Sequence, residues 1–287
     1  MTVRKSIALG LAIVTTVVGV GAWKVGSLIM APTHCRILKP AGFPAEDVEF
    51  RDSYGEKIKG WWLPAQNDSP TVLIVHGIDA NRLAMVGRAN FYRRLGYAVF
   101  LFDLPAHGES EGDHVSFGSH EGASISAALD WIRAHAKNPR VAVDGVSLGG
   151  AGVVLRPENS GFAAVILEAV FPDIHRALLN RLTDRLGVIG YVLEPAFLAQ
   201  IILRLDEWPG SLSPTDRIAT INAPVLVMGG EVDHLTKENE TRELFDHARE
   251  PKQLWIVPKC GHADFLAKMP REFEEIVGGF LEKYLRK

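Results

Sequence analysis

The stretch that most constrains the fold of this chain runs from Val141 to Gly152. It combines a short β-branched strand, the sharp turn Gly145–Gly149, and small residues that begin a helix. The two glycines let neighbouring backbone approach a serine that the turn holds in a strained conformation. The helix that follows directs its free N–H groups toward the place where a tetrahedral oxyanion would form. Ser147 is therefore predicted to be a nucleophile at the end of a strand.

Buried strands and helices alternate along most of the chain. Thr71–Val75 and Tyr97–Phe102 are continuous apolar runs, as expected of strands covered on both faces. A helix is predicted between them at Arg82–Leu95, and another follows at Ser119–Ala136. This alternation predicts an α/β fold with a mostly parallel, doubly wound sheet. Further strands are predicted at 141–143, 163–167, 225–228 and 254–257, an antiparallel edge hairpin at 48–50 and 57–63, and a final helix at 271–284.

An insertion separates two of these strands. Residues 171–212 are largely apolar and have a helical period over Ile174–Leu186 and Val188–Leu203. We expect this segment to form a small helical cap over Ser147. Its apolar residues are explained equally well by an acyl-chain site and by packing of the cap against the core.

Polar residues follow the predicted strands at their carboxyl ends, where ligands bind in sheets of this kind. His262 follows the last strand and is predicted to be the base that accepts the serine proton. Asp233 follows the preceding strand and is predicted to orient His262, with Glu231 and Glu168 as alternative acids. Ser147, Asp233 and His262 follow one another along the chain in the order that the catalytic serine, acid and histidine have in α/β hydrolases.

Two backbone N–H groups are predicted to hold the oxyanion. Leu148 follows the nucleophile, and Ile78 lies in the loop after the strand that leads to His76. His76 itself is interpreted as structural. Asp79 and Arg82 are interpreted as a solvated or structural pair, with contact to the substrate as the alternative role.

Several motifs together carry a resemblance to a known family. They are His76-Gly77, Asp103 with His107–Ser110, the turn at Ser147, Pro224–Gly229 with Asp233, and Glu250–Val257 leading to Gly261-His262. From about Glu46 to Lys287 the chain resembles α/β-hydrolase-fold serine hydrolases of the membrane-anchored ABHD13/BEM46-like branch. The resemblance implies hydrolysis of an ester or thioester through an acyl-serine intermediate, without a cofactor. One departure is Pro157, which shortens the helix after Ser147.

The first 31 residues predict a membrane anchor. A basic start, Met1–Lys5, precedes Ser6–Trp23, which has no charged residue, and Lys24 is followed by the uncharged Val25–Ala31. We expect an uncleaved anchor over residues 1–31 and a hydrolase domain over residues 32–287, on the extracytoplasmic side. A cleaved signal peptide is the competing interpretation.

Composition excludes other classes of function. The net charge of −3 and the absence of any Lys/Arg-rich block argue against nucleic-acid binding. Cys35 and Cys260 are expected to be unpaired thiols. The spacing of His107, His114 and His120 is too loose for a metal site, so no metal is expected.

The sequence thus predicts a membrane-anchored serine hydrolase that acts on a lipid-like or acylated substrate. An inactive membrane-tethered binding or scaffold domain of the same fold is the main alternative. A peroxidase or a peptidase is also compatible with the fold. Oligomeric state is left open by the sequence.

Overall fold

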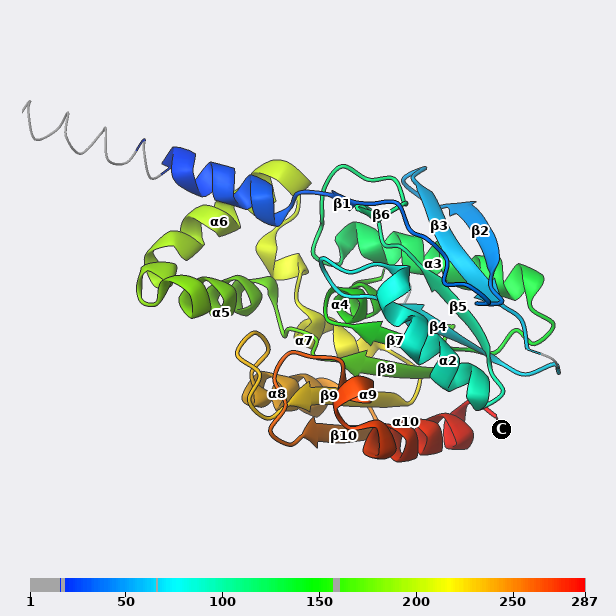
Figure 1. The fold of residues 1–287 in the computed structure, drawn as a ribbon. Helices are drawn as coiled ribbons and strands as arrows, with labels where there is room; N and C mark the ends of the chain where they lie inside the picture. The colour runs from blue at the N-terminus through cyan, green and yellow to red at the C-terminus, as the bar shows by residue number, and fades with distance from the viewer. Residues whose placement is uncertain (1–15, 17–18, 66, 157–160, 287) are drawn as a thin grey trace, which may run out of the picture.

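The computed structural model describes residue 16 and residues 19–65, 67–156 and 161–286. An eight-stranded sheet forms the middle of the molecule, and helices lie on both of its faces (Figure 1). The strand order is β10-β9-β8-β7-β4-β5-β3-β2. The pairs β2·β3 and β3·β5 are antiparallel and the other pairs in this sheet are parallel, which confirms the predicted sheet and its edge hairpin.

The elements have the following bounds. The strands are β1 Thr33–His34, β2 Glu46–Arg51, β3 Lys57–Leu63, β4 Thr71–Val75, β5 Ala98–Phe102, β6 His107–Gly108, β7 Val141–Val146, β8 Ala164–Glu168, β9 Val225–Gly230 and β10 Lys252–Val257. The α-helices are α2 Val86–Arg94, α3 Ser119–His135, α4 Leu148–Leu155, α5 Ile174–Leu186, α6 Ile189–Leu205, α7 Pro214–Arg217, α8 Glu238–His247, α9 Phe265–Lys268 and α10 Pro270–Tyr284. Three 3₁₀ turns, η1 Arg82–Met85, η2 Pro209–Ser211 and η3 Ile218–Thr220, complete the set.

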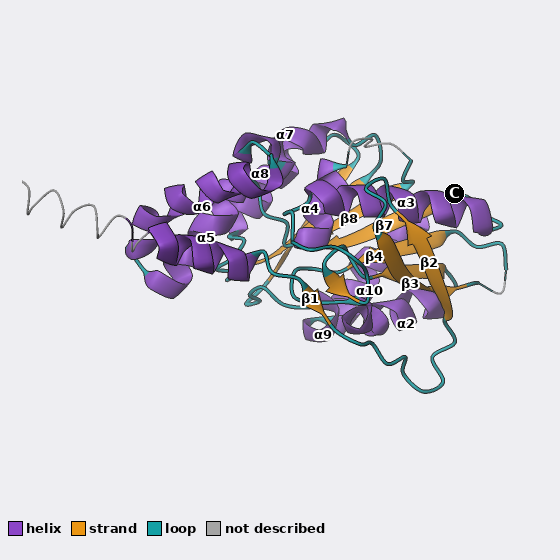
Figure 2. Cartoon of the chain, turned by 90° about the horizontal axis from the view of Figure 1, so that it is seen from above, coloured by secondary structure: helices purple, strands orange, loops and turns teal. Residues whose placement is uncertain are grey.

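Two hydrophobic cores lie on opposite faces of the sheet. Helices α3, α4 and α8 contribute to one core, and α2 and α10 contribute to the other (Figure 2). All five residues of β4 are buried because this strand lies at the centre of the sheet between the two layers. The continuous apolar runs in the sequence are thus explained by strands that have no solvent-facing side.

The register of the parallel strands brings their carboxyl ends to one edge. Val146 at the end of β7 is paired with Glu168 at the end of β8, and Glu168 is paired with Met228 of β9. Gly230, the last residue of β9, is paired with Val257, the last residue of β10. The loops that follow these strands therefore start side by side.

Two local features differ from the prediction. The helix predicted from Arg82 begins with the 3₁₀ turn η1, where the Arg82 N–H donates to the Asp103 carboxylate at 2.8 Å and the Leu83 N–H donates to the Asn81 side chain. The short parallel pair β1·β6 was not predicted, because two-residue strands have no periodicity to detect.

The predicted cap region contains α5 and α6, which extend beyond the sheet as a helical pair (Figure 1). The Asn180 side chain of α5 donates to the Leu235 carbonyl in the loop after β9 at 3.3 Å, and to the Glu240 carboxylate of α8 at 2.9 Å. The cap is therefore held at the carboxyl edge of the strands.

A helix over residues 19–29 precedes β1 and packs on α6. Residues 1–15 and 17–18, which make up most of the predicted anchor, lie outside the described residues. Within the part of the chain that the structure describes, no helix combines the length and the apolar character needed to cross a bilayer. The membrane anchor stays a prediction.

The turn from β7 into α4 is packed tightly against its neighbours. A Cβ added at Gly149 would lie 2.5 Å from the His76 carbonyl oxygen and 2.6 Å from that of Val75. Both are backbone atoms of a central strand and its loop, which have little room to move. Helix α4 thus approaches the end of β4 through a position where a side chain does not fit.

Replacing Gly149 with alanine is expected to lower the free energy of unfolding by about 1–3 kcal/mol, because the added methyl overpacks backbone. The matched control is Gly87→Ala in α2, where an added Cβ meets no atom within 4 Å. That change is expected to raise the free energy of unfolding by up to about 1 kcal/mol through helix propensity. Urea unfolding measures both, and equal effects would contradict this account of the turn.

Candidate active site

Ser147 occupies the turn between β7 and α4 in an unusual backbone conformation. Its φ of 51° and ψ of −112° lie outside the regions that most residues adopt. The conformation is held from both sides, since the Ser147 N–H donates to the Glu168 carbonyl at 2.7 Å and the Ala151 N–H donates to the Ser147 carbonyl. The predicted strand, turn and helix are present, and the serine side chain lies at the carboxyl edge of the sheet.

Asp233 and His262 are brought together from the ends of β9 and β10. The Asp233 Oδ2 accepts a hydrogen bond from His262 Nδ1 at 2.8 Å. The Asp233 Oδ1 accepts from the N–H groups of Leu235 and Thr236 at 2.8 and 2.9 Å, which fixes the carboxylate in place. The carboxylate selects the tautomer of His262 that leaves Nε2 available for a second partner.

The relation between Ser147 and His262 is looser than that between Asp233 and His262. Within the described residues, no hydrogen bond joins the Ser147 hydroxyl to the imidazole. Both residues follow strands whose carboxyl ends lie on one edge, with β8 and β9 between them. Hydrogen bonds of this kind are often long before substrate binds, so the arrangement is compatible with a serine–histidine pair.

The loop that carries Ile78 lies directly beside the serine. A Cβ added at Gly77 would be 3.4 Å from the Ser147 Cβ. No backbone hydrogen bond in the described structure uses the N–H of Ile78 or of Leu148. Both N–H groups remain free for an incoming oxygen, as an oxyanion hole requires.

His76 holds this loop in position. Its Nδ1 donates to the Gly77 carbonyl at 2.7 Å, and its Nε2 accepts from the Leu104 N–H at 2.9 Å. Burial, together with the neighbouring His107 ring, lowers the pKa of His76 to about 3. The ring is therefore neutral, which agrees with the structural role expected for it.

The Asp103–Ser110 motif forms a second brace behind the loop. The buried Asp103 carboxylate binds the Arg82 guanidinium and accepts from the Glu109 N–H at 2.9 Å. The Ser110 hydroxyl donates to the Asp103 carbonyl at 2.7 Å. The predicted pairing of Arg82 with Asp79 is wrong: Arg82 is buried against Asp103 and Glu109, because these carboxylates lie on the loop that η1 packs against.

A buried charge cluster under the site was missed by sequence reasoning. Arg88 of α2 binds Glu168, lies 3.1 Å from the Asp144 Oδ2, and lies 2.8 Å from the Asp264 Oδ1. Burial raises the pKa of Glu168, an effect that the Arg88 guanidinium opposes. The one signal in the sequence was an arginine on the apolar face of a predicted helix.

This cluster bears on the alternative acids. The Glu168 carboxylate accepts from Arg88 rather than from His262, since its Oε2 lies 2.7 Å from the Arg88 guanidinium. Glu231 accepts from the Lys259 N–H at 2.6 Å, so it fastens the loop that leads to His262. Of the three acids considered, Asp233 is the one bonded to the imidazole.

Helix α5 of the cap carries an arginine whose pKa is influenced by Asp233. Arg181 of α5 donates to the Ala177 carbonyl at 3.0 Å. Burial lowers the pKa of Arg181, and the carboxylates of Asp233 and Asp79 partly offset this. The Asp233 carboxylate thus favours the charged form of Arg181.

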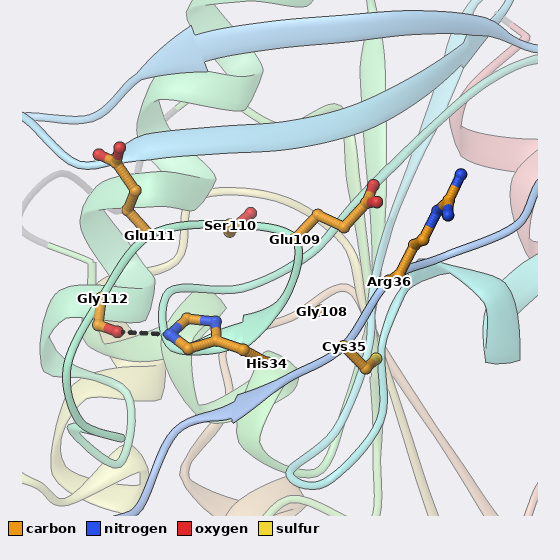
Figure 3. A pocket seen from close by; sticks show the side chains of 8 residues that line it. All are labelled: His34, Cys35, Arg36, Gly108, Glu109, Ser110, Glu111 and Gly112. Atoms are coloured by element: carbon orange, nitrogen blue, oxygen red, sulfur yellow. Dashed lines mark hydrogen bonds between the residues drawn. The ribbon is translucent and has the colours of Figure 1, made fainter.

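A shallow pocket of about 550 Å³ lies at β1 and β6, lined by residues 34–36 and 108–112 (Figure 3). In it the His34 ring lies 3.0 Å from the Gly112 carbonyl oxygen. None of the predicted catalytic residues lines this pocket. Cys35 lies in it as a free thiol, and Cys260 is free and buried, which confirms that the cysteines are unpaired.

Metal binding finds no support in the site geometry. Among the residues that the structure describes, no group of three or more His, Cys, Asp or Glu side chains is placed to hold a metal ion. His107 bonds to the Pro105 carbonyl, and His120 stacks on Tyr54. These histidines are engaged in local packing.

Comparison with known proteins identifies the family. A model of the alpha/beta hydrolase family matches residues 72–276. The chain belongs to this family. The match covers the strand ends that carry Ile78, Ser147, Asp233 and His262.

Two bacterial relatives are similar over most of this alpha/beta hydrolase. The uncharacterized protein YfhR of Escherichia coli (strain K12) is 26% identical over 237 residues, which are 80% of this chain and 77% of YfhR. The uncharacterized protein Rv2307c of Mycobacterium tuberculosis (strain ATCC 25618 / H37Rv) is 30% identical over 229 residues, 78% of this chain and 74% of Rv2307c.

A solved structure supports the fold. The esterase Pf2001 of Pyrococcus furiosus superposes with a TM-score of 0.74 at 22% sequence identity, covering 89% of this chain and 98% of the esterase. Likeness at this level of identity shows that the two chains share the alpha/beta hydrolase fold.

The His76 contacts predict how stability depends on pH. The unfolded chain binds a proton at His76 near pH 6.5, whereas the folded chain does so only near pH 3. Because the unfolded state binds more protons between these values, the free energy of unfolding is expected to fall as pH drops from about 6.5 toward 3. In His76→Gln this dependence should be weaker, although one lost hydrogen bond costs about 1 kcal/mol at neutral pH.

The measurement is urea unfolding at a series of pH values. Glu168 and the other acids titrate in both proteins, so their contributions cancel in the comparison. His247→Gln, at an exposed position of α8, controls for the loss of a histidine as such. Parallel pH profiles for the wild type and His76→Gln would contradict the structural role of a neutral His76.

Proposed function

We propose that this alpha/beta hydrolase cleaves a carboxylic ester or thioester through an acyl-serine intermediate. The observation that carries the proposal is the Asp233–His262 hydrogen bond of 2.8 Å, at the same sheet edge as a serine held at positive φ. A carboxylate, an imidazole and a serine in this chain order are the parts that such chemistry needs.

The proposed mechanism has two half-reactions. Ser147 Oγ attacks the acyl carbonyl carbon while His262 Nε2 accepts the hydroxyl proton, and Asp233 stabilises the resulting imidazolium. The carbon–oxygen or carbon–sulfur bond to the leaving group then breaks as His262 returns the proton to it. In the second half-reaction, water attacks the acyl carbonyl carbon while His262 accepts its proton. The bond to Ser147 Oγ then breaks, His262 returns the proton to this oxygen, and the carboxylic acid is released.

Backbone donors stabilise both tetrahedral intermediates. The N–H groups of Ile78 and Leu148 point to the oxyanion, and each such donor typically lowers the barrier by about 3 kcal/mol. His76 and the Asp103–Arg82 pair act at one remove, because they fix the loop that presents Ile78. No step of this mechanism calls for a cofactor.

The apolar character of the cap supports the proposed substrate class. Its buried surface is apolar, with Leu178, Leu182, Phe197 and Ile201 directed into the core between α5, α6 and the rest of the molecule. A lipid-like or acylated substrate fits a site with such a cover. Membership of the ABHD13/BEM46-like branch is part of the same proposal.

Location at a membrane completes the proposal. Residues 1–31 would anchor the chain, with the hydrolase domain on the extracytoplasmic side. The support is the uncharged run from Ser6 to Trp23 behind a basic start. A reporter fused to the C-terminus determines which side of the membrane the domain occupies.

Labelling with a fluorophosphonate probe tests the nucleophile. The wild type in the membrane fraction should be labelled, while Ser147→Ala and His262→Ala should not. Asp233→Asn should slow labelling by about 10⁴-fold, because the histidine loses its orienting partner. Glu231→Gln removes the charge of a neighbouring carboxylate that is not bonded to His262, and it should keep wild-type labelling because the amide oxygen can still accept from the Lys259 N–H. A folded wild type that stays unlabelled even in detergent would favour the binding or scaffold alternative.

Chain-length dependence tests the substrate class. With p-nitrophenyl esters from acetyl to decanoyl, kcat/KM is expected to rise by up to roughly fourfold for each methylene that becomes buried. Labelling by the fluorophosphonate probe, measured in parallel, shows that the serine is active whatever the acyl preference. Equal kcat/KM values from acetyl to decanoyl would contradict the proposal of a lipid-like substrate, but not the proposal of ester hydrolysis.

A further inference from the structure

Helix α6 has an apolar face directed to the outside of the molecule. Between Leu186 and Leu203 the sequence contains one charged residue, Glu194. Glu194 is 6% exposed and lies 3.1 Å from the His175 ring of α5. Polar groups of this helix therefore point inward, opposite to the arrangement of a helix on a water-soluble surface.

The outward side chains form one surface, which we call the outer cap surface. It consists of Val188, Ile189, Tyr191, Val192, Ile202 and Leu203, whose exposed fractions lie between 40% and 80%. Four of these positions lie at the start of α6 and two near its end, so the face is apolar along the whole helix. Pro195 and Ala199 lie between them and are also exposed.

The helix over residues 19–29 extends this surface. The Gln200 side chain, 4% exposed, donates to the Ala22 carbonyl at 3.0 Å, and the Arg204 guanidinium donates to the Trp23 carbonyl at 2.9 Å. The same guanidinium stacks on the Trp23 ring at 3.9 Å. Gln200 and Arg204 of α6 thus hold the N-terminal helix, which presents Val20, Val25 and Leu28 to the outside.

An apolar helix of this kind is covered in a folded protein by a core or by lipid. Here α6 lies at the far end of the molecule, away from the sheet and beside the N-terminal helix (Figure 1). The sequence that leads into that helix, Ser6–Val18, has no charged residue. Continuity with this uncharged segment argues for lipid as the covering phase.

The residues around the surface fit a membrane interface. Tyr191 and Trp208 are exposed aromatic side chains at its two ends, and Trp23 lies on the N-terminal helix. Tyrosine and tryptophan are enriched where a bilayer meets water. The cations Lys24 and Arg185 are exposed at its margin, where long side chains reach the headgroups.

We propose that the outer cap surface rests in the interfacial region of a phospholipid bilayer, so that the cap is itself a membrane-contacting element. The contact is separate from attachment through residues 1–31. It deepens the proposed function, because substrate would enter from the bilayer past α5 and α6, and α5 contacts the loop that carries Asp233 through Asn180.

The test places an environment-sensitive NBD dye on single cysteines of the full chain in phosphatidylcholine bilayers. The parent is Cys35→Ser, in which the remaining Cys260 is buried and is checked for lack of labelling. At Val188→Cys and Val192→Cys the emission should shift to the blue, and lipids carrying a doxyl quencher on the acyl chain should remove most of it. These positions are exposed, so the substitutions leave the core intact.

Two control positions separate contact from mere attachment. Leu38→Cys carries the dye at a similarly exposed position outside the cap, and Lys137→Cys carries it at an exposed position just after α3. If residues 1–31 alone attach the protein, positions 188 and 192 should behave like these controls, which would overturn the proposal.

A second unfavourable outcome identifies another occupant. Blue-shifted emission at 188 and 192 that doxyl lipids leave unquenched would mean that protein covers the surface, either residues 1–18 or a second copy of the chain. The dye signal does not depend on hydrolysis, so its failure and the failure of fluorophosphonate labelling are independent results.

Discussion

The buried cluster around Arg88 is the interaction on which the rest of the site depends. One guanidinium from α2 binds carboxylates at β7, at the end of β8, and in the loop after His262, and the Tyr92 hydroxyl completes the Asp144 carboxylate at 2.7 Å. Arg88, Asp144 and Glu168 are buried, whereas the Asp264 side chain is 48% exposed. Buried charges of this kind need partners, since an unpaired one carries a large desolvation penalty. The cluster therefore ties β7, the end of β8 and the loop after His262 to α2.

This arrangement separates the support of the site from its chemistry. The Glu168 side chain binds Arg88, and the Glu168 carbonyl accepts a hydrogen bond from the Ser147 N–H. One residue therefore links the charge cluster to the strained serine. Asp264 links the loop that carries His262 to the same cluster through its ion pair with Arg88. On the other side of the serine, His76 fixes Gly77 and Leu104 as a neutral ring. The reactive groups are thus surrounded by contacts that have no need to move a proton.

Much of this architecture was readable from the sequence, and the reason lies in periodicity. Strands such as Thr71–Val75 and the cap helix Ile174–Leu186 have the predicted bounds because apolar runs and helical spacing are local signals. The pairing of Asp233 with His262 followed from chain order at strand ends, whereas the partners of Arg82 and Arg88 did not. Those ion pairs join residues 21 to 176 positions apart, and charge alone does not specify which of many carboxylates will meet an arginine.

The link between the N-terminal helix and the body of the molecule is short and fastened at both ends. The helix is bonded to α6 through Gln200 and Arg204, and three residues after its last turn β1 pairs with β6 beside the Asp103 loop. Such a connection has no slack. If the N-terminal helix is fixed to a surface, this connection sets the distance and the orientation of the carboxyl edge of the sheet relative to that surface. A substrate bound at the same surface would then be selected first by the distance of its reactive group from the surface, and only afterwards by its fit to the site.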